Sequence, residues 1–177
     1  MAKKDLLVIE MNNKEDMECF NFREKLKIAQ KPYDYFKEIE NLNFDQLASS
    51  DRIFLQDFGI YNNELNDEEF MLRLRFPAGR ISNNSLLLIS NLAQKYNLQI
   101  ILTARAGIQL HGLDSNNILE VFNQINSQNI SSYQSFGDNI RNITSDIFDG
   151  IGVYNIIEVF PYIEQMQSYI LNHPDYI

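Results

Sequence analysis

The clearest hydrophobic pattern in the chain begins at Phe70. In the segment FMLRLRFP, every second residue is apolar, namely Phe70, Leu72, Leu74 and Phe76. This strict period of two predicts a strand whose apolar side chains face a core, while Arg73 and Arg75 share the opposite face. Pro77 and Gly79 follow and end the predicted strand.

Two amphipathic helices are predicted downstream of this strand. Ser82 can cap the first, over SNNSLLLISNLAQKYN, and Asp114 or Ser115 can cap the second, over SNNILEVFNQINSQN. The buried stripe expected in the first helix comprises Leu86, Ile89, Ala93 and Tyr96. The stripe expected in the second comprises Ile118, Val121, Phe122 and Ile125, at the i, i+3, i+4, i+7 spacing of one helix face.

The segment LQIILTARAGIQLHG between these helices is rich in β-forming residues and then alternates. If it stays extended as one strand, its polar face carries Thr103, Arg105, Gly107, Gln109 and His111. Its other face is apolar. This segment is therefore expected to supply a second arginine-bearing strand beside the first.

Weaker patterns predict the remaining elements. KPYDYFKEIENL is typical of a short helix after Pro32, DRIFLQDFGIY of a strand followed by a glycine turn, and ISSYQSF of a short β segment. Gly137, Asp138 and Asn139 favour a tight turn before Arg141. EVFPYIEQMQSYILNHPDYI predicts a helix that begins after Pro161 and ends near His173-Pro174.

The middle of the chain is thus predicted to fold as β-α-β-α-β. We expect an α+β fold, a two-layer sandwich in which both helices cover one face of a sheet and the other face is open. Residues 1–66 are interpreted as an N-terminal arm or cap, 67–150 as the sandwich domain and 151–177 as a helical linker.

Composition places the chain in the ordinary globular range. Its 177 residues are 45% hydrophobic and 22% charged, and the sequence contains no run of 18 apolar residues and no signal-peptide pattern, so a cytoplasmic location without membrane contact is expected. Cys19 is the single cysteine, which excludes a disulfide framework or a metal cluster held by several thiolates of this chain. His111 and His173 lie too far apart for a metal motif, so no metal ligand is assigned.

Charge is distributed unevenly along the chain. The net charge of −9 argues against nucleic acid as a partner, yet residues 71–141 carry six cations against three acidic residues. Five of the six are arginines, at positions 73, 75, 80, 105 and 141. Arginine suits planar recognition of carboxylates and oxyanions. The alternative is a solvated sheet face whose charges form scattered ion pairs.

Three segments resemble one known family in order and spacing. FMLRLRFPAGRIS, LTARAGIQLHGL and GDNIRNIT are similar to motifs in the N-terminal half of the siroheme-dependent nitrite and sulfite reductases. NFREKLKIAQKPYDYF, DRIFLQDFGIYNNE and the C-terminal helix also resemble that half. The resemblance runs from about Asn21 to the end and implies a ferredoxin-like half-domain.

The resemblance implies a function and a set of roles. The parent enzyme would be an oxidoreductase that reduces sulfite to sulfide or nitrite to ammonia by six electrons, at a siroheme coupled to a four-iron four-sulfur cluster. Arg73 and Arg141 would face the oxyanion. The residues expected to hold or surround the eight siroheme carboxylates are Thr103, Arg105, Gln109 and His111. Arg75 could bind a carboxylate or be structural, and Asn142 could orient the arginine beside it.

The chain also departs from the family. Ala104 and Ala106 stand where the family often has a polar residue and a glutamine. The family's substrate-binding lysines and four cluster cysteines lie beyond the stretch resembled here, so the chain alone is expected to be inactive, without the cluster. Expected partners are the second half of the reductase, in the same or another chain, and a ferredoxin or flavoprotein donor. The alternatives are a stand-alone half-domain that binds a tetrapyrrole or a partner chain, and a remnant with a structural role.

Overall fold

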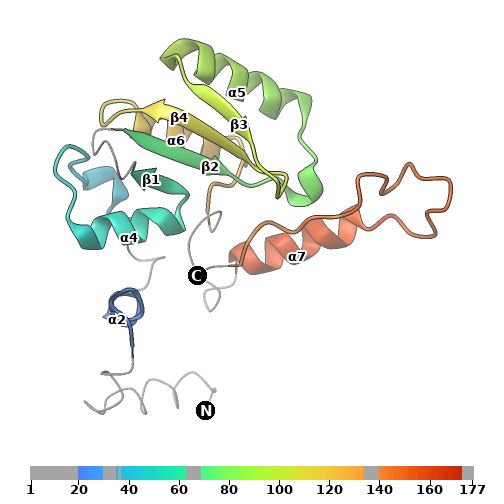
Figure 1. The fold of residues 1–177 in the computed structure, drawn as a ribbon, viewed down its shortest axis with the longest axis horizontal. Coiled ribbons are helices and arrows are strands. Elements are labelled where there is room, and N and C mark those ends of the chain that lie inside the picture. The colour runs from blue at the N-terminus through green and yellow to red at the C-terminus, as the bar shows by residue number, and fades with distance from the viewer. Residues whose placement is uncertain (1–19, 30–34, 36, 63–68, 134–139, 173–177) are drawn as a thin grey trace.

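The computed structural model describes residues 20–29, 35, 37–62, 69–133 and 140–172. A four-stranded antiparallel sheet forms one layer, in the order β1-β2-β4-β3, and helices α5 and α6 form the other (Figure 1). The strands are β1 (Ile60–Asn62), β2 (Phe70–Leu74), β3 (Gln99–Leu102) and β4 (Ile108–Leu113). The helices are α2 (Phe22–Ala29), α4 (Ser49–Asp57), α5 (Asn83–Tyr96), α6 (Ile118–Ser127) and α7 (Phe160–Asn172). The predicted two-layer α+β architecture is confirmed.

The topology places β4 between two strands that precede it in the chain. Helix α5 connects β2 to β3, and β4 then returns antiparallel to both. This is a split βαβ arrangement of the ferredoxin-like type. After α6, the chain returns to the C-terminal end of β2, where Ser131 forms a single antiparallel bridge with Arg75. The short β segment predicted at residues 130–136 is therefore present as this one bridge within its described part.

The alternation of β2 sorts its side chains as predicted. Leu72 and Leu74 are at most 1% exposed and lie opposite Leu110 and Ile108 of β4 on the helix-covered face. All four residues predicted for the stripe of α6 are buried in the same core. In α5, Ser82 accepts a hydrogen bond from the Ser85 amide at 3.1 Å, so the predicted cap is present.

Three details of the sequence prediction are wrong. The segment 99–113 is a hairpin, because the chain turns at Thr103–Gly107 with Ala106 in the left-handed region at φ 56°. The segment that begins at Asp51, predicted as a strand, instead lies in helix α4 (Ser49–Asp57), and Gly59 then turns the chain at φ 78° into β1. Leu86 is 52% exposed, and Ile89 and Leu92 form the buried stripe of α5.

Helix α7 packs against the 3₁₀ turn Pro77–Gly79 and begins one residue before Pro161. Its first turn is capped by Asp149, whose carboxylate accepts hydrogen bonds from the Val159 and Phe160 amides at 2.8 and 2.9 Å. Arg80 holds the start of α7 in place, because its guanidinium pairs with Glu158 at 2.8 Å and lies over the Phe160 ring. The predicted C-terminal helix is confirmed from residue 160 to 172.

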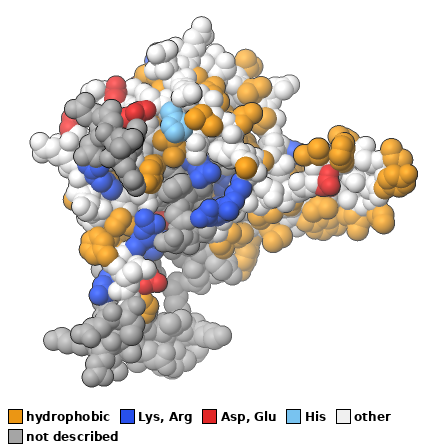
Figure 2. Space-filling view, viewed as in Figure 1, with side chains coloured by type: hydrophobic (Ala, Val, Ile, Leu, Met, Phe, Trp, Pro, Cys, Tyr) orange, Lys and Arg blue, Asp and Glu red, His pale blue; other side chains and the backbone are white. Residues whose placement is uncertain are grey.

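Between Asp149 and Glu158 the chain projects away from the sandwich (Figure 1). Ile151, Val153, Tyr154, Ile156 and Ile157 are 61–95% exposed. Figure 2 shows this projection as a largely apolar extension beside a group of Lys and Arg side chains. We call residues 147–157 the apolar arm.

Several sequence predictions lie outside the described residues. They concern residues 1–18 of the predicted N-terminal arm, Cys19, the start of the helix after Pro32, the turn at Gly137–Asn139, and His173. Within that predicted helix, Tyr35 and Ile39 are buried, and residues Ile39–Asn41 form a 3₁₀ turn.

Candidate anion-binding site

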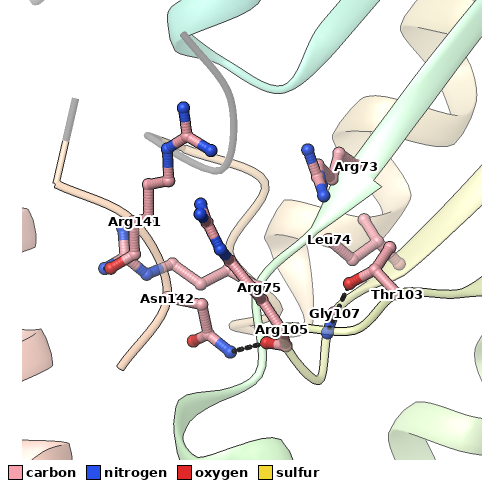
Figure 3. A pocket seen from close by; sticks show the side chains of 8 residues that line it. All are labelled: Arg73, Leu74, Arg75, Thr103, Arg105, Gly107, Arg141 and Asn142. Carbon is pink, nitrogen blue, oxygen red and sulfur yellow. Dashed lines mark hydrogen bonds between the residues drawn. The ribbon is translucent and has the colours of Figure 1, made fainter. Parts of the chain in front are cut away.

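Three segments far apart in the sequence meet at one pocket beyond the end of β2. They are the end of β2, the turn of the β3–β4 hairpin, and the irregular segment 140–142 (Figure 3). The residues that line the pocket are Arg73, Leu74, Arg75, Thr103, Arg105, Gly107, Arg141 and Asn142. These are the same three segments that carry the sequence motifs.

The hairpin turn holds its shape through Thr103. The Thr103 hydroxyl accepts a hydrogen bond from the Gly107 amide at 3.0 Å, and the Ala106 amide donates to the Thr103 carbonyl. A Cβ at Gly107 would lie 2.9 Å from the Leu74 carbonyl oxygen, so the close approach of the turn to β2 requires glycine there. The turn thereby brings Arg105 to the end of β2.

Arg75 holds segment 140–142 against the sheet. Its side chain is buried, and its two terminal nitrogens donate to the carbonyls of Ile140 and Arg141 at 2.8 and 2.6 Å. Its Nε donates to the Oε1 of Gln167, on α7, at 2.8 Å. Burial lowers the pKa of Arg75 to about 10, which still leaves it a cation at neutral pH. The sheet face is therefore covered at Arg75, contrary to the expectation that Arg73 and Arg75 share an open face.

Asn142 ties the three segments together. Its side-chain amide nitrogen donates to the Phe76 carbonyl at 2.7 Å and to the Arg105 carbonyl at 2.9 Å. Both bonds require the nitrogen to point at the two carbonyls, which fixes the orientation of the amide. The buried Oδ1 of Asn142 is left as an acceptor without a partner within the described structure.

The three arginines that remain create a local excess of positive charge. Arg73, Arg105 and Arg141 gather on one side of the pocket (Figure 3). Burial lowers the pKa of Arg73, and the charges of Arg141 and Arg105 lower it further. Among the described residues, the Arg105 and Arg141 guanidiniums have no acidic side chain within ion-pair distance. Three clustered cations of this kind favour the binding of an anion.

Gln109 and His111 lie outside the pocket on the same sheet face. Gln109 is opposite Arg73 in the register of β2 and β4, and His111 is opposite Met71. Their side chains are half-buried and lie 3.1 Å apart, Gln109 Oε1 to His111 Nε2. The polar face predicted for this strand thus extends from the pocket along β4.

The structure brings together six of the eight predicted site residues and adds one that the sequence analysis missed. Gln167 is 5% exposed on α7 and binds Arg75. A signal was present in the sequence, because Gln167 interrupts the apolar stripe formed by Ile163 and Ile170 at helical spacing. A polar residue in such a stripe requires a buried partner.

The pocket encloses about 20 Å³, which is room for about one water-sized group. A tetrapyrrole would have to lie over its mouth, along the face that Gln109 and His111 extend. Among the described residues, no group of three His, Cys, Asp or Glu side chains is placed to hold a metal ion. The described part of the chain also contains no helix long and apolar enough to span a membrane.

Comparison with known proteins gives a consistent result. Residues 63–128 match the model of the nitrite/sulfite reductase ferredoxin-like half domain. A ferredoxin–nitrite reductase of Leptolyngbya laminosa is 27% identical over 158 residues, covering 85% of this chain and 31% of that protein. A sulfite reductase [NADPH] hemoprotein beta-component of Paenibacillus sp. (strain JDR-2) is 33% identical over 97 residues, covering 51% of this chain and 17% of that protein.

The fold agrees with this relationship. The structure of the Mycobacterium tuberculosis NirA protein superposes with a TM-score of 0.79 at 20% identity, covering 88% of this chain and 33% of that protein. This chain spans about a third of the length of the nitrite reductases it matches. The matched segment is thus similar to the ferredoxin-like half domain of the nitrite and sulfite reductases, and the superposition shows that the two chains share a fold.

Proposed function

We propose that this chain supplies siroheme- and anion-binding side chains to a nitrite or sulfite reductase and is not catalytically complete by itself. One observation carries the proposal, namely that Arg73, Arg105 and Arg141 line one pocket, where burial and then the charges of the other two arginines lower the pKa of Arg73. Siroheme carries eight carboxylates, and nitrite and sulfite are anions. Both ligands match the charge of the cluster.

Arg73 and Arg141 are proposed to face the substrate. Two guanidiniums at one mouth would neutralise the oxyanion and donate hydrogen bonds to its oxygens as these leave as water. When bound, siroheme would supply the iron that coordinates the anion and takes part in its six-electron reduction. The chain has one cysteine, so four thiolates for an iron–sulfur cluster must come from outside it.

The siroheme carboxylates are assigned to the rest of the polar face. Arg105 from the hairpin turn, with Thr103 beside it, would bind carboxylates near the pocket. Gln109 and His111 would bind carboxylates farther along β4. The Oδ1 of Asn142 can accept a hydrogen bond from a protonated acid or a water molecule at the same place. For Arg75, its hydrogen bonds to Gln167 and to the carbonyls of Ile140 and Arg141 support the structural alternative.

The partners follow from the same proposal. The rest of a reductase, in the same or a separate chain, would complete the site and dock on exposed apolar surface. The apolar arm is such a surface, since Val153, Tyr154 and Ile156 are more than nine-tenths exposed. The electron donor would be a ferredoxin, as the names of several relatives state, or a flavoprotein. The substrate would be nitrite or sulfite.

A siroheme titration of the chain tests the proposal. We expect the Soret band of siroheme to shift and saturate with the wild-type chain. Arg105→Met is expected to weaken binding by about tenfold, the value of one charge-assisted hydrogen bond. Lys95→Met is the matched control, since Lys95 is an exposed cation on α5 that pairs with Glu120 outside the pocket. No Soret shift at high micromolar siroheme, or equal loss in both variants, would overturn the proposal.

The apolar arm favours a second candidate function. A half-domain that binds a partner chain without catalysis would need exposed apolar surface of this kind and no tetrapyrrole. Replacing Val153 and Ile156 with serine would then abolish association with a second half-domain. Under this alternative, the chain would associate with its partner in the absence of siroheme, and Arg105→Met would leave that association unchanged.

A further inference from the structure

Helix α7 is connected to the arginine cluster through the buried side chain of Arg75 and its hydrogen bonds. Gln167, on the inner face of α7, accepts from Arg75 Nε at 2.8 Å. Arg75 in turn donates to the carbonyls of residues 140 and 141. Gln167 and Arg75 are 5% and 2% exposed, so water cannot replace either partner without a local opening.

The geometry points to Gln167 as a positioning residue for Arg141. The guanidinium of Arg75 is planar, and its five N–H groups have fixed directions. The hydrogen bond from Nε to Gln167 therefore sets the plane in which the terminal nitrogens meet the two carbonyls. The carbonyl of Arg141 is held by one of these nitrogens, so the position of its backbone is fixed. The side chain of Arg141 extends from this fixed backbone and lines the pocket. This inference rests on the proposed function for its ligand, and it adds α7 to the residues that determine the site.

The outer face of α7 gives the link a further consequence. Tyr162, Met166 and Tyr169 are 56–58% exposed on the side of the helix opposite Gln167. A change in the position of α7 would move Gln167 relative to Arg75 and so change the position of Arg141.

The test compares three variants of the full chain. Gln167→Leu removes the acceptor at nearly constant volume, and Gln167→Asn withdraws it by one methylene in case the first variant does not fold. Gln165→Leu is the matched control, because Gln165 is exposed on the same helix. The first readout is the NMR signal of the Arg141 side-chain Hε–Nε group and backbone amide, in the chain without ligand.

Both Gln167 variants are expected to shift the Arg141 signals, while Gln165→Leu leaves them in place. The second readout is siroheme affinity, which should fall about threefold to tenfold in Gln167→Leu. In an Arg141→Ala background the same substitution should have no effect, because its route to the ligand is gone. A general loss of structure would weaken binding in both backgrounds.

The outcomes separate this inference from the proposed function. Unchanged Arg141 signals in both folded Gln167 variants would overturn the inference, whatever the siroheme affinity. Shifted Arg141 signals in a chain that does not bind siroheme would support the positioning role and contradict the proposed ligand. An equal loss of affinity with and without Arg141 would overturn the inference while leaving siroheme binding intact.

Discussion

Replacing Arg75 with methionine should destabilise the chain severely, because this arginine is buried and holds several segments together. The substitution removes the donor from the buried Gln167 Oε1 and from the part-buried carbonyls of Ile140 and Arg141. Hydrogen bonds from a charged donor contribute about 1.5–3 kcal/mol each, and the desolvation of Arg75 offsets part of that sum. We expect the free energy of unfolding to fall by about 3–5 kcal/mol, because the lost hydrogen bonds outweigh the relief of burying the charge.

Arg73→Met is the matched control, two residues away on the same strand. Arg73 is only half-buried, and its pKa is lowered, so the folded state disfavours its charge. Removing that charge relieves repulsion with Arg105 and Arg141, and the free energy of unfolding should change by less than about 1 kcal/mol. Urea unfolding at neutral pH, followed by circular dichroism, measures both variants. Equal destabilisation by the two substitutions would refute this account of Arg75.

Three further outcomes are expected. Asn142→Ala should lower the free energy of unfolding by about 1–3 kcal/mol, because the Phe76 and Arg105 carbonyls lose their donor. Thr144→Ala, at an exposed neighbouring position, should lower it by less than about 0.5 kcal/mol in the same urea assay. Gly107→Ala should lower the free energy of unfolding by about 1–3 kcal/mol, because its Cβ meets a backbone oxygen at 2.9 Å, and a neutral result in thermal denaturation would count against that contact. Sulfite should raise the melting temperature of the wild-type chain and not that of Arg141→Met, and an equal rise in both would place the anion elsewhere.

The sandwich could be predicted because its elements have strong local signals. The apolar residues of β2 lie on one face of the strand, and those of α6 lie on one face of the helix. Both faces are buried together only when the helices cover one side of the sheet. The hairpin at Thr103–Gly107 was missed because TARAG contains no glycine pair, and its turn depends on Ala106 in a left-handed conformation. Helix α4 was missed because IFL at its centre is equally typical of a buried strand.

The candidate site was only partly predictable. The motifs singled out Arg73, Arg105 and Arg141, and these three residues do line one pocket, while their roles toward a ligand stay a prediction. Alternation along β2 placed Arg75 on the same face as Arg73, but it could not show that α7 and segment 140–142 cover that end of the strand. Contacts of this kind depend on long-range packing, and a period-two pattern carries no information about them.

We infer that three distant segments of the chain present their arginines to one anionic ligand. The most direct measurement is the arginine side-chain NMR spectrum of the chain, titrated with metal-free siroheme. The signals of Arg73, Arg105 and Arg141 should move together and saturate at one ligand concentration, while those of Arg23 and Arg80 remain in place. Movement of all arginines in parallel, or of none, would contradict the claim.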